Sequence, residues 1–167
     1  MPARKPIVAK DRGALRQHLL ELLTGGHAHV PFDAAVKNLP AALRGKRPRG
    51  VEHSPWEIVE HLRIAQGDIL EFSRNPRHQS PEWPGGYWPA TPAPPDEKAW
   101  EKSLRAFHRD LKALCALVED PATDLFQRIP HGDGQTVLRE ALLAADHNAY
   151  HFGELILVRR LLKAWPG

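Results

Sequence analysis

The chain has very little cysteine. Cys115 is the only cysteine among 167 residues, which excludes an internal disulfide framework. A structural zinc site built from four thiolates is excluded for the same reason. Such low cysteine usage is typical of proteins in a reducing compartment, so we expect a cytoplasmic protein. Cys115 itself falls between apolar positions of a helical segment, which predicts a small buried side chain and not a nucleophile.

Long hydrophobic runs are also missing. No apolar stretch approaches the roughly 20 residues that a membrane-spanning helix needs. The N-terminal segment has basic residues but no apolar core, so we expect neither a signal peptide nor a membrane partner. The formal net charge of +3 is modest and does not argue for nucleic-acid binding. The composition is that of a soluble globular protein.

Two metal-binding motifs are absent from the sequence. A di-iron carboxylate bundle needs Glu-x-x-His pairs on two helices, and the chain contains none. The His-Glu-x-x-His signature of many metalloproteases is missing as well. There is also no strand-like alternation and no internal repeat, so the remaining pattern is helical throughout.

Helical periodicity occurs in four segments separated by stretches rich in proline and glycine. These segments run over about residues 11–23, 54–75, 96–119 and 135–163, and they predict an all-α fold. The length supports a single domain, expected over about residues 11–167 after a flexible N-terminus at residues 1–10. The connections are too long for tight turns, so at least one should cross the bundle. The first connection, between the first and second helical segments, has room for a short helix around residues 31–39.

Local signals fix several helix boundaries. The tetrapeptide Ser54-Pro55-Trp56-Glu57 combines an N-cap serine, a proline at the first helical position and a capping-box glutamate. The pair Gly25-Gly26 should end the first segment, whose inward face is predicted to carry leucines. These leucines are Leu15, Leu19 and Leu22. The third segment has the clearest apolar seam, at Trp100, Leu104, Phe107, Leu111, Leu114 and Val118.

Three histidines interrupt the apolar seams of two of these segments. His61 lies beside the seam of the second segment, and His147 and His151 lie on that of the fourth. Because His147 and His151 are four residues apart, a helix places both on one face, about 6 Å apart along the axis. Any one of them alone would suit a hydrogen-bonded core residue. Together they predict a three-histidine metal site with an open position, which is typical of catalytic zinc-type centres.

Four other residues are candidates for a supporting role. Glu57 lies four residues before His61, but its capping-box position already accounts for it. His108 flanks the seam of the third segment and is a weaker candidate ligand. Asp146 and Glu154 neighbour the histidine pair, where they could accept a hydrogen bond from a ligating imidazole or act as a general base. Solvated charges would have the same spacing.

The other histidines are not expected to join the site. His53 precedes the cap of the second segment, about 12 Å along the axis from His61, and His131 falls in a loop. The remaining ones have no partner at ligand spacing and are expected to be solvated: His18, His27, His29 and His78.

Two loops have unusual compositions. The linker between the second and third segments contains Trp83 and Trp88, which are expected to cover a pocket or the surface of another subunit, since unpartnered large aromatics are unfavourable. The basic run at residues 44–49 could bind an anion near the start of the second segment, although such loops are more often simply solvated.

Taken together, HSPWEIVEHL at residues 53–62, the tryptophan-bearing linker and ADHNAYHFGELILVRRLL at residues 145–162 resemble the DinB-like (YfiT-like) family of small metal-binding helical bundles. The resemblance covers nearly the whole chain from Asp11 onward. It implies an up-down-down-up four-helix bundle, frequent homodimers, and a zinc or nickel ion bound by one histidine of the second helix and a His-x-x-x-His pair of the fourth. These positions match His61, His147 and His151.

The function expected from these observations is that of a metal-dependent enzyme. Characterised members of the family that the chain resembles include bacillithiol transferases and mycothiol-dependent maleylpyruvate isomerases, so a thiol-dependent S-transferase acting on a small molecule is the leading hypothesis. A bound ion would activate a thiol or water at neutral pH, or polarise an electrophile. A metal-dependent hydrolase and a non-catalytic, stress-related metal-binding protein are the alternatives. No motif selects a particular thiol.

Overall fold

The computed structural model describes residues 9–166 and is helical, as predicted. The helices are α1 Ala9–Thr24, α2 Phe32–Val36, α3 Pro55–Arg74, α4 Glu97–Glu119 and α5 Val137–Leu161, with short 3₁₀ turns η1 Ala41–Leu43 and η2 Gly85–Tyr87. The described residues form no strand, only an isolated bridge between Arg128 and Thr136. Most of the N-terminus predicted to be flexible, residues 1–8, lies outside the described residues. None of the described helices is long and apolar enough to cross a membrane.

The boundaries of the long helices follow from capping. Ser54 and Glu57 form the predicted capping box at the start of α3, with proline at the first helical position. Asp96 and Thr136 cap α4 and α5 by accepting hydrogen bonds from backbone N–H groups in the first turn. At the C-terminal end of α1, Gly25 adopts a φ of 71°, a backbone conformation that residues with a side chain rarely adopt. This glycine ends the helix.

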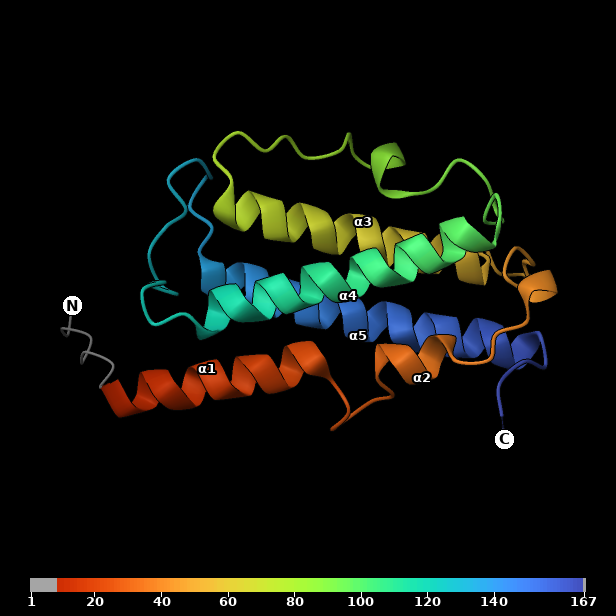
Figure 1. Ribbon diagram of the computed structural model, residues 1–167, viewed down its shortest axis with the longest axis horizontal. Helices are drawn as coiled ribbons and strands as arrows, with labels where there is room; N and C mark the ends of the chain where they lie inside the picture. The colour runs from red at the N-terminus through yellow and green to blue at the C-terminus, as the bar shows by residue number, and fades with distance from the viewer. Residues whose placement is uncertain (1–8, 167) are drawn as a thin grey trace.

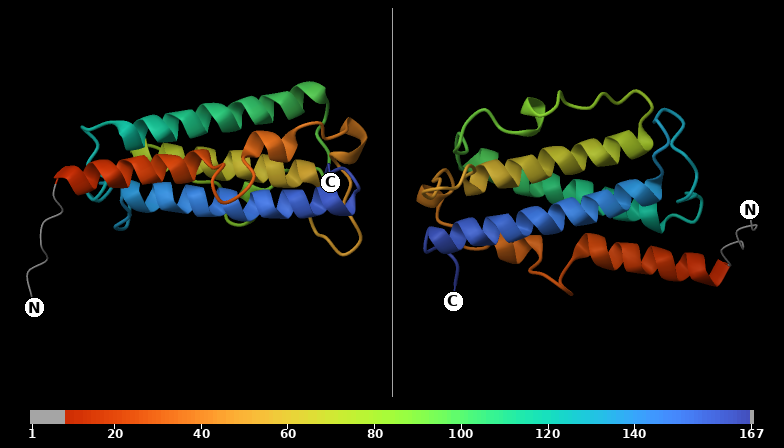
Figure 2. Two further views of the ribbon diagram at one scale, coloured as in Figure 1. Left: turned by 90° about the horizontal axis from the view of Figure 1, so that it is seen from below. Right: turned by 180° about the vertical axis from the view of Figure 1, so that it is seen from behind.

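The four long helices form one bundle (Figure 1). α1 and α5 run in one direction, whereas α3 and α4 run in the other. Each of α1 and α3 packs against both α4 and α5. Because α3 and α4 are parallel, the connection at residues 75–96 must return along the bundle, and it does so over the outer side of α3 (Figure 1). Figure 2 shows α2 beside α5, on the side of the bundle that α1 occupies further along.

The bundle core consists of two apolar clusters. One surrounds Leu70, Leu114 and Ala141, and the other surrounds Leu62, Phe107 and Leu155. α3, α4 and α5 each contribute to both clusters. Between them lies a polar layer in which the amide of Asn148 donates to Gln66, and Gln66 donates to the carbonyl of Phe107. A bundle core interrupted by buried polar groups at mid-length is a site where ligands are commonly held.

Most of the predicted inward faces are confirmed, with two corrections. Leu22 was expected to face the core, but its side chain is 54 % exposed and Leu23 is buried instead, because the inward face of α1 continues from Leu19 by a step of four residues and not three. Cys115 was expected to be buried, but it is half-buried at the edge of the cluster around Leu114. Burial raises the pKa of its thiol, and Glu119 adds to this effect.

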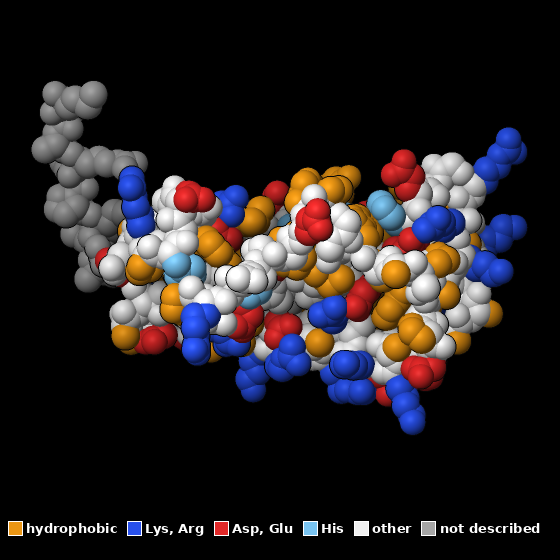
Figure 3. Space-filling view, turned by 90° about the horizontal axis from the view of Figure 1, so that it is seen from above, with side chains coloured by type: hydrophobic (Ala, Val, Ile, Leu, Met, Phe, Trp, Pro, Cys, Tyr) orange, Lys and Arg blue, Asp and Glu red, His pale blue; other side chains and the backbone are white. Residues whose placement is uncertain are grey.

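The outer surface carries both signs of charge. On the face covered by the linker at residues 75–96, acidic side chains are interspersed with basic ones (Figure 3). In the basic run at residues 44–49, Arg44 pairs with Glu97 and lies over the ring of Trp100, while Arg47 pairs with Glu57. These arginines therefore stabilise the start of α3 and α4 and are not free to bind an anion.

Candidate metal centre

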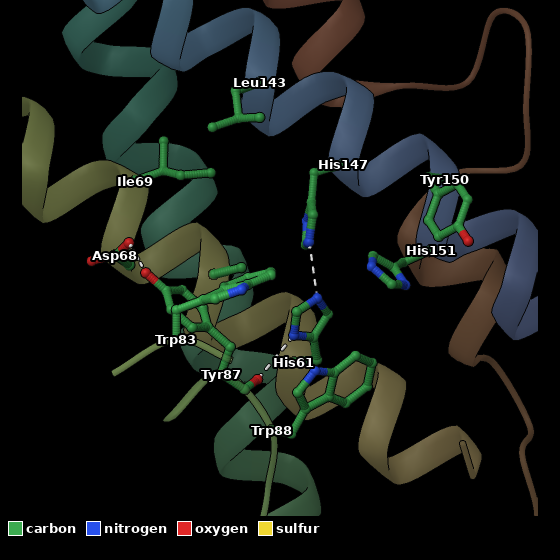
Figure 4. A pocket seen from close by; sticks show the side chains of 11 residues that line it. His61, Asp68, Ile69, Trp83, Tyr87, Trp88, Leu143, His147, Tyr150 and His151 are labelled. Atoms are coloured by element: carbon green, nitrogen blue, oxygen red, sulfur yellow. Dashed lines mark hydrogen bonds between the residues drawn. The ribbon is translucent and has the colours of Figure 1, made fainter. Parts of the chain in front are cut away.

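The three predicted histidines meet in the polar layer between α3 and α5 (Figure 4). His61 projects from the middle of α3, and His147 and His151 project toward it from successive turns of α5. One ring nitrogen from each lies within 4.8 Å of those of the other two, and this is the one group of three or more potential metal-ligating residues found within the described part of the chain. His61 and His151 are buried, and His147 is half-buried. Two helices distant in sequence thus bring together three imidazoles.

The hydrogen bonds of the rings determine which nitrogens face the centre. His61 Nδ1 donates to the backbone carbonyl of Tyr87 at 2.9 Å, and His151 Nδ1 donates to a carboxylate oxygen of Glu154 at 2.7 Å. In a neutral imidazole this leaves Nε2 with its lone pair. The Nε2 atoms of His61 and His147 lie 2.9 Å apart, so His147 is the donor of that pair. Its own Nδ1 is buried and has no hydrogen-bond partner among the described residues.

This arrangement fits a metal ion better than it fits a self-contained hydrogen-bond network. Ligating histidines usually donate their second N–H to a carbonyl or carboxylate, as His61 and His151 do here. His147 Nε2 points at another nitrogen lone pair while His147 Nδ1 is left without a partner. With the His147 proton on Nδ1 in place of Nε2, all three Nε2 lone pairs would be free to bind a cation. Neutral imidazole nitrogens suit a borderline-soft divalent ion.

Burial keeps two of the three rings, His61 and His147, neutral. Burial, with added repulsion from His151 and His61, lowers the pKa of His147 to about 4. Burial also lowers the pKa of His61 below its usual value, and it outweighs the hydrogen bond to Tyr87. At neutral pH these imidazoles are therefore unprotonated, which is the form that binds a metal.

Neighbouring side chains hold the rings of His61 and His151 in place. Trp88 is stacked between His53 and His61, with ring centroids 3.9 and 4.0 Å away. Glu154 accepts hydrogen bonds from both His151 and His53, the latter at 3.2 Å. Burial disfavours the charge of Glu154, but these two hydrogen bonds lower the pKa of the carboxyl below its usual range. Glu154 is thus an anion that orients the ring of His151.

His53, just before the N-cap of α3, was not expected to share an ion with His61, and this is confirmed. It is not a member of the three-residue group. It still contacts the site through Trp88 and Glu154.

The other supporting candidates lie as follows. Glu57 is committed to the capping box and to Arg47, as its spacing indicated. His108 is excluded from the site because it pairs with Asp33 on the outside of the bundle. Asp146 is exposed and makes no hydrogen bond or ion pair within the part of the chain that the structure describes, so of the two acids beside the histidine pair only Glu154 reaches the site.

Two of the histidines expected to be solvated are not. His78 donates to Asp68 at 2.7 Å, and its side chain is mostly buried. His29 packs edge-on against Phe152. His18, in contrast, is exposed and pairs with Glu21, a contact within one turn of α1. Both corrections involve loop residues, whose environment is set by tertiary packing and not by helical spacing.

A pocket of about 480 Å³ opens beside the three histidines. The linker tryptophans Trp83 and Trp88 border the pocket, as expected for large aromatic residues in a loop. Tyr150 of α5 lies on the opposite side (Figure 4). Two further residues were not anticipated: Tyr87, whose carbonyl holds His61, and Asp68, which accepts from the Tyr87 hydroxyl at 2.7 Å. Desolvation and the neighbouring Asp68 raise the pKa of Tyr87 to about 12, so it remains a donor. The tyrosine in the tryptophan-rich linker was the only sequence signal for this role.

Comparison with known protein families matches residues 28–155 to the DinB superfamily. The chain belongs to this superfamily. The matched range runs from before α2 into α5 and contains all three histidines of the centre, while α1 lies outside it. No curated protein and no solved structure matches the chain significantly. Membership of the DinB superfamily together with the three-histidine cluster fits a metal-binding protein.

Proposed function

We propose that this DinB-superfamily chain is a metal-dependent enzyme in which His61, His147 and His151 bind one divalent ion, zinc or nickel. The observation that carries the proposal is the convergence of three imidazoles, two of them kept unprotonated by burial, beside an open pocket. Three protein ligands leave a coordination position for a substrate or water, whereas a structural site is normally closed by a fourth. When bound, such an ion would lower the pKa of a coordinated thiol or water and polarise an electrophile.

The residues around the ligands have separate tasks in this proposal. The Tyr87 carbonyl and the Glu154 carboxylate fix the orientation of His61 and His151, so that their Nε2 atoms point inward. Trp88 stacks on His61 and restricts its ring to one plane. The pocket between the linker and α5 admits the reactants and limits water around them.

We propose further that the reaction is transfer of an electrophilic carbon to the sulfur of a low-molecular-weight thiol. A carbon–sulfur bond forms, the bond from carbon to its leaving group breaks, and the thiol proton passes to solvent. The thiol must come from a cosubstrate, because Cys115 lies on α4, is not among the residues lining the pocket and has a raised thiol pKa. The pocket beside the cluster supports an enzyme over a non-catalytic metal-binding protein, which would not need a substrate-accessible position.

The first test is the metal content of the purified protein. We expect about one zinc or nickel ion per chain, and His147→Ala and His151→Ala should each remove most of it by eliminating one of only three ligands. His108→Ala, which removes a histidine from the outer surface of α4, is the matched control and should retain the metal. Elemental analysis that finds no transition metal, or equal metal in all four proteins, would contradict the proposal.

The second test is turnover. Metal-loaded protein is offered monochlorobimane with a panel of bacterial thiols, and conjugation releases chloride and produces fluorescence. We expect metal-dependent conjugation that His61→Ala reduces by about 100-fold or more, as is typical when a ligand of a catalytic metal is lost, while Cys115→Ser retains it. Cleavage of esters or amides with no thiol requirement would favour the hydrolase instead. Absence of both activities in metal-loaded protein would favour the non-catalytic alternative.

A further inference from the structure

The pocket beside the histidine cluster has an unusual lining. Apart from the three histidines, the side chains that line it are apolar or aromatic with a single exception, Asp68. Ile69 of α3 and Leu143 of α5 face each other at the end away from Trp88, and Trp83 borders the pocket on the linker side (Figure 4). Ligand sites of this kind gain most of their affinity from burying apolar surface.

The one charged residue of the lining is already paired through both of its carboxylate oxygens. One oxygen of Asp68 accepts from His78 and the other accepts from the Tyr87 hydroxyl, both at 2.7 Å. No lysine or arginine lines the pocket. The Glu154 carboxylate, which accepts from His151 beside the pocket, is also negative. An anionic group in the pocket would therefore find no cationic side chain to offset its desolvation.

Two aromatic side chains at the edge of the pocket are exposed to an unusual degree. Trp83 is 76 % exposed and Tyr150 is 71 % exposed, although both line the pocket. Large aromatic surfaces facing solvent on either side of a concave site gain contact area when the site is filled by a flat apolar molecule. Trp83 also packs edge-on against Tyr87, which ties its ring to the linker.

The size of the pocket limits the molecule that it can hold. A cavity of about 150 Å³ is large enough for benzene, so about 480 Å³ corresponds to two fused rings with room for a substituent.

We propose that this pocket binds an uncharged, flat aromatic molecule of about two fused rings, held between Trp83 and the Ile69–Leu143 pair, with its reacting group directed toward the three histidines. The direction of the reacting group rests on the proposed function, in which this molecule is the electrophile. Binding of the ring itself depends only on the pocket.

The proposal is tested by calorimetric titration of the full-length protein, both zinc-loaded and chelator-treated, with two matched probes. 2-Naphthol is neutral at pH 7, whereas naphthalene-2-sulfonate has the same rings and a fixed negative charge. We expect 2-naphthol to bind the chelator-treated protein at least about tenfold more tightly, because only the sulfonate leaves an unpaired charge in the pocket. Equal affinities, or tighter binding of the sulfonate, would overturn the proposal.

Variants locate the binding. Leu143→Gln places a polar amide in the apolar lining of the pocket, and Trp83→Ala removes an aromatic ring from the lining. Each substitution should weaken 2-naphthol binding about tenfold. Leu22→Gln makes the same leucine substitution on the exposed face of α1 and serves as the matched control. Unchanged 2-naphthol affinity in both pocket variants would also refute the proposal.

The two proposals fail separately. Zinc content is measured on the same preparations. Zinc binding without 2-naphthol binding would refute the aromatic ligand and leave the metal centre standing. Binding of 2-naphthol to wild-type protein that takes up no zinc, lost in Leu143→Gln, would uphold the pocket and refute the metal-dependent function.

Discussion

Glu140 is a buried carboxylate near the start of α5, and its side chain is 3 % exposed. Burial raises the pKa of this group, Arg139 on the same helix partly offsets the effect, and Asp68 on α3 adds to it. The folded protein therefore holds the Glu140 proton more tightly than the unfolded chain does. Between the unfolded pKa and the raised folded pKa, the free energy of unfolding decreases as pH rises, so at neutral pH this charge destabilises the fold.

From this sign we predict that Glu140→Gln is more stable than the wild type at pH 7 and that the difference shrinks toward zero at pH 4, where the glutamate is protonated in both states. Urea unfolding of both proteins at pH 4, 5.5 and 7 measures this difference in the free energy of unfolding. Comparing the two proteins cancels the contribution of the histidine cluster, which both contain. Glu101→Gln, at an exposed acid of α4, should show no such pH-dependent difference. A Glu140→Gln protein less stable than wild type at pH 7 would show that its pairing with Arg139 outweighs the cost of burial.

Arg159 is a buried cation that joins the end of α2 to α5. It is 1 % exposed, and its guanidinium donates to the carbonyls of Ala35 and Lys37 at the end of α2 and to that of Ala164 after α5. The ring of Trp165 lies against it. No carboxylate pairs with this arginine in the described chain, so backbone carbonyls alone compensate its desolvation. Arg159 thus docks the first linker onto α5.

We predict that Arg159→Met destabilises the protein by about 2–4 kcal/mol, because three buried carbonyls lose charged donors and α2 loses its attachment. Arg160→Met, at the exposed neighbouring position, should change stability by less than about 0.5 kcal/mol. Chemical denaturation of both variants provides the comparison. Equal effects at the two positions would mean that the linker is held by its apolar contacts, not by Arg159.

The whole bundle has two apolar clusters, one on either side of the histidine layer, and neither depends on a bound ion. We therefore predict that chelation leaves the helical circular dichroism spectrum unchanged and lowers only the thermal midpoint. Zinc at about 100 times its Kd would add about 2.7 kcal/mol of stability. In His147→Ala, the midpoint should not respond to zinc. Loss of helix on chelation would instead make the site structural, as in a zinc finger.

We also propose that the chain forms a homodimer. α5 carries an exposed apolar face at Leu142, Leu157 and Leu161, and the last two lie one turn apart. Exposed leucines in such a row favour burial against another surface. We expect light scattering coupled to size exclusion to give twice the chain mass, and Leu157→Glu with Leu161→Glu to give the monomer. Leu22→Glu, at an exposed leucine of α1, should remain dimeric; a monomeric wild type would refute the proposal.

The sequence alone determined the helices and the identity of the three clustered histidines. Capping residues such as Ser54 and Asp96, and apolar residues at three- and four-residue steps, act within one or two helical turns, so they can be recognised without the fold. The spacing of His147 and His151 places them on one face for the same reason. Even so, the leucine pattern of α1 misplaced Leu22, because two adjacent leucines satisfy the same local rule.

Only the tertiary structure decided what surrounds those histidines. His61 meets α5 because α3 packs against that helix. Trp88 stacks between His53 and His61 because the 75–96 linker returns along the bundle. Glu154 accepts its second hydrogen bond from His53, which lies at the end of another loop. The apolar pocket likewise combines side chains from α3, α5 and that linker. Long connections follow no periodic code, and their course depends on contacts between residues distant in sequence, which is why residues 53, 68, 78 and 87 acquired their roles only in the folded chain.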